Sequence, residues 1–301
     1  MKEQFEKFIA DLQNSICQGI EQIDGKEKFK EDVWQREGGG GGVTRVISNG
    51  NVFEKGGVNR SAVFGEVTPA LATQLKTQGS HFFATGISLV IHPKSPMVPT
   101  VHANFRYFEL YDQSKSKIDC WFGGGADLTP YYLFEEDAIY FHQTFKNACD
   151  QFDKSFYPKF KLQCDDYFNN THRGNERRGV GGIFYDYLRP NEIQSEEFLF
   201  EFSQACGNAF NKAYLPIVEK RKNLSFTEDQ IKWQELRRGR YVEFNLIHDR
   251  GTIFGLKSNG RTESILMSLP PRVRFEYDDK PISGSKEEEL TNVLKNPKQW
   301  I

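Results

Sequence analysis

The sequence lacks any paired or clustered cysteines and any long apolar run. Its five cysteines show no Cys-x-x-Cys spacing, which disfavours a cysteine-bound zinc or iron–sulfur centre and indicates reduced thiols in a cytosolic protein. No stretch approaches the roughly 20 apolar residues that a membrane span requires. We therefore expect a cytoplasmic protein without a membrane span. The cysteines are Cys17, Cys120, Cys149, Cys164 and Cys206.

Phosphate-binding signatures and a large net charge are also missing. No strand pattern leads into Gly-x-Gly-x-x-Gly and no Gly-Lys-Ser/Thr loop is present, which disfavours the nucleotide-binding folds. The 39 basic and 41 acidic residues nearly balance, so we expect no nucleic-acid partner. Any anion must bind locally, and no motif for flavin, haem or another organic cofactor is visible.

Aromatic side chains, by contrast, are abundant: the 301 residues include 26 Phe and 12 Tyr. Rings bury large areas, so we expect a core and a pocket built from them, with walls that suit a large flat ligand. The length fits one large domain or two ordinary ones.

Several helices can be predicted from their ends. Apolar residues at helical spacing indicate an amphipathic helix within residues 1–25 rather than a signal peptide. Capping boxes at Thr227 and Ser285 predict helices that end at Gly239 and before Pro297, and Thr68 followed by proline predicts a third start. We expect longer helices over residues 135–152 and 195–222, the second interrupted at Pro216.

Strand-like segments lie between these helices, and short turns join most neighbours. This arrangement favours hairpins in one antiparallel sheet with helices packed on it, an α+β fold. The predicted strands are residues 84–92, 100–110, 117–123, 181–188, 241–248, 252–257 and 272–277.

The segment 86–110 is the most informative for chemistry. Side chains alternate along a strand, and with residues 93–99 as the hairpin loop Ser88 falls opposite Asn104. One surface then carries two histidines, an arginine and smaller polar groups, types that bind ligands and transfer protons. The alternative is that this surface only meets water. Its residues are Ser88, His92, His102, Asn104 and Arg106.

Three further segments offer charged groups. Residues 239–255 read as a strand with Glu243 and Asn245 on one face and a turn at Asp249 and Arg250, which supplies either a hairpin tip or an oriented base. Asp127 follows three glycines that let a ligand approach the backbone, although it could equally cap a helix. Arg261, after a glycine turn, can hold a carboxylate.

Histidines could also form a metal site, although nothing in their spacing demands one. His142 and His172 would join His92 and His102. For His142, which stands in a helical pattern beside phenylalanines, a hydrogen-bonded core position is the alternative.

Taken together and in order, the segments resemble the oxygen-dependent coproporphyrinogen III oxidase family. They are VWQREGGGGGVTRVISNGNVFEKGGVNRSAVFGE, GISLVIHPKSPMVPTVHANFRYFE, WFGGGADLTPYYLFEEDAIYFH, THRGNERRGVGGIFYDYL, RRGRYVEFNLIHDRGTIFGL and NGRTESILMSLPPRVRFEY. The resemblance covers residues 30–278, between the N-terminal helix (1–25) and a C-terminal helix (280–301). It implies a single domain over residues 1–301, with a large, mostly antiparallel sheet of about seven strands between layers of helices, and a homodimer joined through residues 241–260.

The resemblance also implies roles for individual residues. His102 matches a proton donor, and Asp127, Arg106, Asp249 and Arg250 match residues that act on a pyrrole ring and its propionates. A divalent metal is possible but not required, at His92, His102, His142 and His172. Substrate contacts are implied for Ser88, Asn104, Phe105, Arg106, Asn259, Gly260 and Arg261.

The implied activity is aerobic oxidative decarboxylation in haem and porphyrin biosynthesis. Two propionates of coproporphyrinogen III become vinyl groups, giving protoporphyrinogen IX, CO2 and H2O2, with O2 as co-substrate and no organic cofactor. We expect either Asp249 or Asp127 to deprotonate the pyrrole N–H. A histidine-rich metalloenzyme and a tetrapyrrole carrier are the alternatives.

Overall fold

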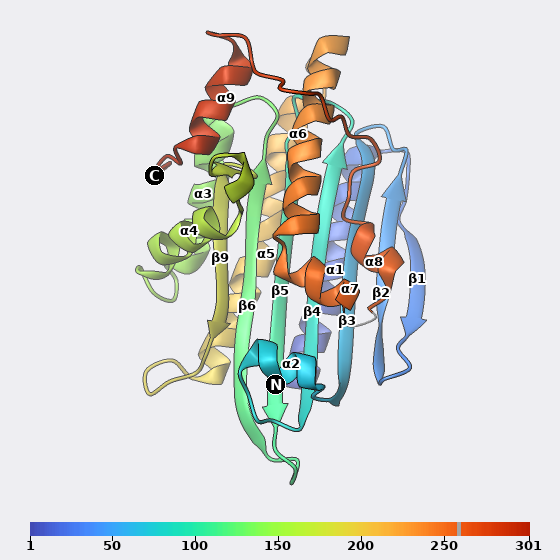
Figure 1. Cartoon of the computed structure of the whole chain (residues 1–301), viewed down its shortest axis with the longest axis vertical. Helices are drawn as coiled ribbons and strands as arrows, with labels where there is room; N and C mark the ends of the chain where they lie inside the picture. Colours follow the sequence, from blue (N-terminus) through green and yellow to red (C-terminus); the bar gives the residue numbers. More distant parts are fainter. Residues whose placement is uncertain (258–259) are drawn as a thin grey trace.

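The computed structural model describes residues 1–257 and 260–301 and has one large antiparallel sheet. Its seven strands follow the order β1-β2-β3-β4-β5-β6-β9, so most neighbours in the sheet are also neighbours along the chain (Figure 1). A short pair, β7 (Asn169–Asn170) and β8 (Glu176–Arg177), lies apart from it. The bounds are β1 (Lys30–Gln35), β2 (Gly40–Ser48), β3 (Phe53–Glu66), β4 (His81–Pro93), β5 (Thr100–Tyr111), β6 (Lys117–Thr129) and β9 (Gly181–Leu188).

Helices cover both faces of this sheet (Figure 1). α1 (Lys2–Asp24) and α5 (Glu196–Arg221) pack together behind the central strands. In front lie α6 (Glu228–Ile247), α7 (Arg250–Lys257) and α8 (Thr262–Leu266). The α+β expectation is therefore confirmed. The other helices are α2 (Pro69–Leu75), α3 (Glu135–Cys149), α4 (Phe156–Tyr167), a 3-10 turn (Thr171–Arg173) and α9 (Lys286–Lys295).

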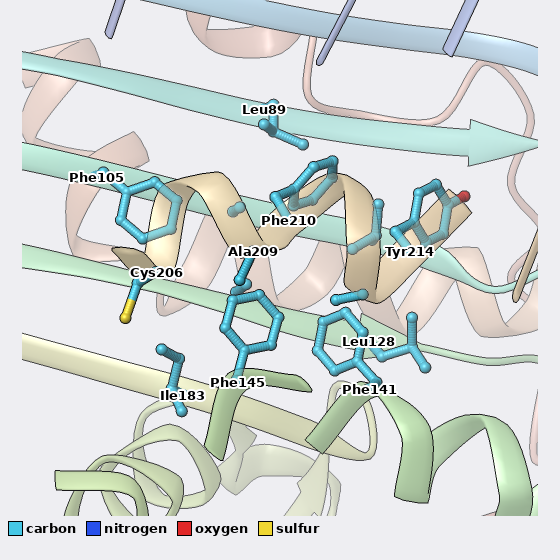
Figure 2. Close-up of a cluster of buried hydrophobic side chains, with 14 of the residues drawn as sticks. Leu89, Phe105, Leu128, Phe141, Phe145, Ile183, Cys206, Ala209, Phe210 and Tyr214 are labelled. Carbon is cyan, nitrogen blue, oxygen red and sulfur yellow. The ribbon is translucent and has the colours of Figure 1, made fainter. Parts of the chain in front are cut away.

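The main core lies between the sheet and the α1–α5 layer and consists largely of rings. Figure 2 shows Phe105 of β5 beside Phe210 and Tyr214 of α5, with Phe141 and Phe145 of α3 below them. All five side chains are fully buried. Burying one such ring contributes roughly 1.5–3 kcal/mol, so this layer holds the sheet in place while the opposite face remains available for a site.

Helix starts are predicted better than helix ends. Thr227 and Ser285 are N-caps as expected, and Thr68 caps α2. Gly239, however, does not end α6, which continues to Ile247. A Cβ at Gly239 would lie 2.7 Å from the Arg274 carbonyl oxygen, so this glycine serves close packing.

The interruption expected at Pro216 is also wrong, because α5 runs through it. Proline has no N–H to donate to the carbonyl four residues earlier. That carbonyl, of Lys212, instead accepts a hydrogen bond from the Tyr140 hydroxyl at 3.0 Å. Helix α3 therefore supplies the missing donor.

Three of the seven predicted strands are wrong, and three strands of the large sheet were missed, as was the short pair β7 and β8. Residues 241–248 and 252–257 lie mainly in α6 and α7, and residues 272–277 form no strand. The missed strands β1, β2 and β3 include six glycines, which weaken a strand pattern. No helix of the described residues is long and apolar enough to span a membrane.

Candidate active site

Solvent reaches the front face of the sheet near its middle. Ser88 is exposed although it lies on β4, a central strand, and pairs with Asn104 of β5 as predicted. On the same face His102 pairs with Asp127 of β6. We call this surface, formed by Ser88, His102, Asn104, Arg106 and Asp127, the site face.

Glycines flank Arg106 on both neighbouring strands. Gly86 of β4 and Gly123 of β6 are its cross-strand partners. A Cβ at Gly123 would lie 2.6 Å from Arg106 Nε, and one at Gly86 would lie 2.9 Å from Arg106 Cβ. The guanidinium can therefore lie across the sheet because its neighbours have no side chains. Its Nη1 donates to the Asn104 side-chain oxygen at 2.6 Å.

His102 and Asp127 are joined by a hydrogen bond of 2.7 Å between Nδ1 and Oδ1. The carboxylate is an acceptor, so Nδ1 carries the hydrogen and Nε2 of the neutral ring is the atom left for a ligand. The His102 side chain is 15% exposed, whereas Asp127 is 1% exposed. Of this pair, only the histidine can reach a substrate.

Arg178, on the loop after β8, holds Asp127 from the other side. Its Nη2 donates to both carboxylate oxygens at 3.0 and 2.9 Å, and its Nη1 donates to Asn245 Oδ1 at 2.8 Å. The guanidinium carbon lies 4.2–4.9 Å from the ring centroids of Phe168, Tyr241 and Phe244. These contacts favour a buried cation because the ring faces carry negative charge.

The charge on Asp127 follows from these neighbours. Burial alone would raise the pKa of its carboxyl, but Arg178 and His102 outweigh burial and hold the pKa below its usual value. A carboxylate so stabilised is a poor proton acceptor. Asp127 therefore orients His102 rather than acting directly on a ligand.

Two arginines meet at Asp186 on β9, beside the site face. Asp186 Oδ1 lies 2.9 Å from Arg106 Nη2, and its Oδ2 lies 3.4 Å from Arg250 Nη2. The side chains of the two arginines are 38% and 54% exposed. Guanidinium groups suit carboxylate ligands, so this cluster can bind an acidic substrate.

Asp249 lies at the junction of α6 and α7, not at the tip of a hairpin. Its Oδ2 accepts the Thr252 N–H at 2.7 Å, as an N-cap does, and its Oδ1 accepts the Tyr167 hydroxyl at 2.9 Å. Tyr167 stacks on Phe184 of β9 with centroids 4.2 Å apart. Burial, followed by the Asp249 charge, raises the pKa of Tyr167 to about 12, so the phenol stays a donor.

The remaining predicted substrate contacts have different surroundings. Phe105 is fully buried in the core on the opposite face, so its side chain does not reach the site face. Arg261, at the start of α8, is ion-paired with Asp32 of β1, and Gly260 donates its N–H to the Gly255 carbonyl. Asn259 lies outside the described residues.

The four histidines predicted to share a metal do not come together. Both ring nitrogens of His92 bond to protein, to Thr100 and to the Ser268 carbonyl, and both of His142 do so, to Tyr157 and to the Val180 carbonyl. Burial lowers the pKa of each to about 3. Within residues 1–257 and 260–301, no three His, Cys, Asp or Glu side chains gather as metal ligands. The donor set does not fit the metal site expected from sequence.

The remaining member of that set, His172, lies near the surface on the 3-10 turn. Its Nδ1 is 2.8 Å from His248 Nε2, and its Nε2 is 2.9 Å from Glu243 Oε2. The two contacts use opposite sides of the ring, so the three groups do not converge on one point.

Sequence reasoning missed Arg178, Asp186 and Tyr167. Arg178 was one of several charges in ERRG, and nothing distinguished it from Arg177. Asp186 carried a usable signal, as the single acid in the apolar strand GIFYDYL. Tyr167 closes an amphipathic helix, and no local pattern separates it from a core residue.

Comparisons with known proteins agree on one family. The family model described as coproporphyrinogen III oxidase matches residues 4–300. Coproporphyrinogen-III oxidase 1, chloroplastic, of Arabidopsis thaliana is 53% identical over 311 residues, covering 100% of this chain and 80% of the relative. The oxygen-dependent coproporphyrinogen-III oxidase of Drosophila melanogaster is 50% identical, covering 100% and 78% respectively.

Proposed function

The chain belongs to the coproporphyrinogen III oxidase family, and we propose that it converts two propionate groups of coproporphyrinogen III into vinyl groups with O2 as co-substrate. One structural observation carries the proposal. A histidine oriented by a buried carboxylate lies on the same sheet face as Arg106, which shares Asp186 with Arg250 of α7, beside the aromatic rings of Tyr167 and Phe184.

Recognition of the substrate follows from its four carboxylates and its flexible macrocycle. Arg106 and Arg250 present exposed guanidinium donors for propionate groups. Ser88 and Asn104 lie on the sheet surface between the two arginines and β3. The glycines beside Arg106 have no side chains, so this part of the sheet surface leaves room for a wide ring system.

Asp249 is our choice of base for the pyrrole N–H. Its carboxylate is held by the Tyr167 hydroxyl and the Thr252 N–H, and among the residues that the structure describes it has no ion pair as close as that of Asp127 with Arg178. Asp127 is buried and its pKa is depressed, so it is the weaker candidate. Taking the N–H proton makes the ring electron-rich, which O2 requires of a closed-shell partner.

The reaction then balances without an organic cofactor. O2 adds to the ring carbon as a peroxide, which takes a proton from the propionate methylene next to the ring. The C–O bond breaks and hydroperoxide leaves. The bond to the carboxylate breaks next, its electron pair forms the vinyl double bond, and CO2 departs. Electrons return to the ring nitrogen, which takes back its proton, and protonated His102 supplies the proton that completes H2O2.

Assembly and location are part of the same proposal. A single domain that forms a homodimer through residues 241–260 is supported by the exposed apolar side chains of Leu246, Ile247 and Leu256. A cytoplasmic location is supported by five cysteines that are all free and buried.

The decisive test compares purified, chelator-treated protein with coproporphyrinogen III in air and under argon. Protoporphyrin fluorescence after chemical oxidation reports the product. Product in air alone is expected. Binding without product would indicate a carrier, and activity that is lost on chelation and restored by a divalent metal would indicate a metalloenzyme.

A further inference from the structure

Asp186 bridges two guanidinium groups in the way that a bound carboxylate does. Each of its oxygens faces a different arginine, Arg106 of β5 at 2.9 Å and Arg250 of α7 at 3.4 Å. A propionate group carries the same carboxylate and would make the same pair of contacts. The protein thus supplies, from its own chain, a group chemically equivalent to the ligand expected there.

The backbone around Asp186 is irregular at this point. The register between β6 and β9 shifts between Phe122 and Gly124, and Tyr187 has a φ of 52°, a left-handed conformation that aromatic residues seldom adopt. Such irregularities often redirect a side chain near a functional site. The Tyr187 N–H donates to Asp186 Oδ1 at 3.0 Å, which fixes the carboxylate locally.

Charge and exposure allow an external carboxylate to compete for this place. Two guanidinium groups face the Asp186 carboxylate, and Asp249 also acts on Arg106, so a bound carboxylate is attracted mainly when Asp186 gives up its place. The side chains are 19% exposed for Asp186 and 38% and 54% exposed for Arg106 and Arg250. Water reaches this pair in part and weakens it, so a substrate carboxylate can compete with Asp186 for the two guanidinium groups.

We propose that Asp186 is a positioning residue whose carboxylate occupies the place between Arg106 and Arg250 that a substrate propionate takes. In the free protein it holds the two guanidinium groups together. On binding, a propionate displaces it, and its negative charge limits how tightly carboxylates are held. The inference rests on the proposed function, because it assumes a tetrapyrrole substrate with propionate groups.

The test measures binding apart from catalysis. Coproporphyrin III, the oxidised tetracarboxylate, is titrated into wild type and Asp186→Asn at several salt concentrations, with fluorescence quenching as the readout. Removing the competing charge should lower Kd about three- to tenfold and make Kd depend more steeply on salt. An unchanged or higher Kd, or an unchanged salt dependence, would overturn the inference.

Matched variants exclude a general effect of losing one acid. Asp11 of α1, on the other side of the sheet, forms an ion pair with Lys7 at 2.7 Å, and Asp11→Asn should leave Kd unchanged. In the double variant Asp186→Asn/Arg250→Gln the gain in affinity for coproporphyrin III should vanish. A gain that persists would contradict the idea that Asp186 and the propionate occupy the same place. Asp186→Ser is the second variant if the amide does not fold, since its hydroxyl can still accept the Tyr187 N–H.

Turnover separates this inference from the proposed function. Wild type that converts coproporphyrinogen III in air, with no tighter binding in Asp186→Asn, would refute the role of Asp186 alone. Wild type that neither binds the porphyrin nor forms product would refute both.

Discussion

Arg178 and Asp127 form an ion pair in which neither side chain is more than 2% exposed. Each charge is therefore tolerated in the interior only because the other is present. The pair also determines the charge that His102 meets, since Asp127 accepts from both the guanidinium and the imidazole.

Replacing Arg178 by glutamine should destabilise the fold strongly. The change leaves a buried carboxylate without its counter-ion, which typically costs about 3–5 kcal/mol. Urea unfolding of the purified variant measures the loss. The control is Arg189→Gln, which breaks a far more exposed pair with Asp119 and should cost less than about 1 kcal/mol. Equal losses in the two variants would show that burial of the Arg178 pair adds nothing.

Asp127→Asn should lower kcat in the molecules that remain folded, although it also leaves Arg178 buried without its counter-ion and should therefore lower stability. The amide keeps the shape but not the negative charge that accepts the His102 Nδ1–H and orients the ring, and loss of this kind of support costs on the order of 10²–10⁴-fold in rate. His102→Ala should be similarly slow. Because the two act as one unit, the double variant should be hardly slower than either single one. Fully multiplicative losses in steady-state kinetics would contradict that coupling.

The variant Asp249→Asn distinguishes the role of Asp249 as a base from its role as a helix cap. Asparagine caps helices about as well as aspartate, so α7 should keep its start while the proton acceptor is lost. We expect kcat to fall about 10²–10⁴-fold at saturating coproporphyrinogen III, with an unchanged circular dichroism spectrum. Full turnover would show that Asp249 is not the base and would leave Asp127 as the candidate.

Two buried histidines should make the fold sensitive to mild acid. The folded pKa of both His92 and His142 is lowered to about 3, mainly by burial. Between that value and the unfolded pKa of about 6.5, the unfolded chain binds protons that the folded protein does not. Stability is therefore lost as pH falls through this window, by up to about 1.4 kcal/mol per pH unit for each histidine.

Urea unfolding at pH 7 and pH 5 checks this prediction. His142→Gln should be less stable than wild type at pH 7, because its two hydrogen bonds change. It should nevertheless lose less stability than wild type on going to pH 5. An identical loss in both proteins would show that His142 does not contribute to the acid sensitivity.

The strand pairing at the site could be predicted from the sequence because it depends on local features. Alternation along residues 86–110 and one hairpin loop give the pairing of Ser88 with Asn104. That prediction, the α+β class and the helix N-caps at Thr68, Thr227 and Ser285 are confirmed.

Other parts depend on tertiary contacts that no local pattern reveals. Residues 241–248 alternate like a strand, yet the capping box at Thr227 begins a helix that continues through them. Pro216 is accommodated because Tyr140, 76 residues earlier in sequence, donates to the carbonyl that proline leaves without its helical partner. The roles of Arg178 and Asp186 depend on residues of other elements. The glycines of β2 and β3 weaken the strand pattern in the sequence, although pairing with neighbouring strands stabilises both.

The direct opposition of His102 and Asp127 on adjacent strands ties activity to correct folding. If β6 slipped by one residue against β5, the aspartate would turn towards the other side of the sheet and the histidine would lose its partner. Molecules with such a pairing error would be catalytically silent. The specific activity of a refolded preparation would therefore report the fraction of chains in which β5 and β6 have the native register.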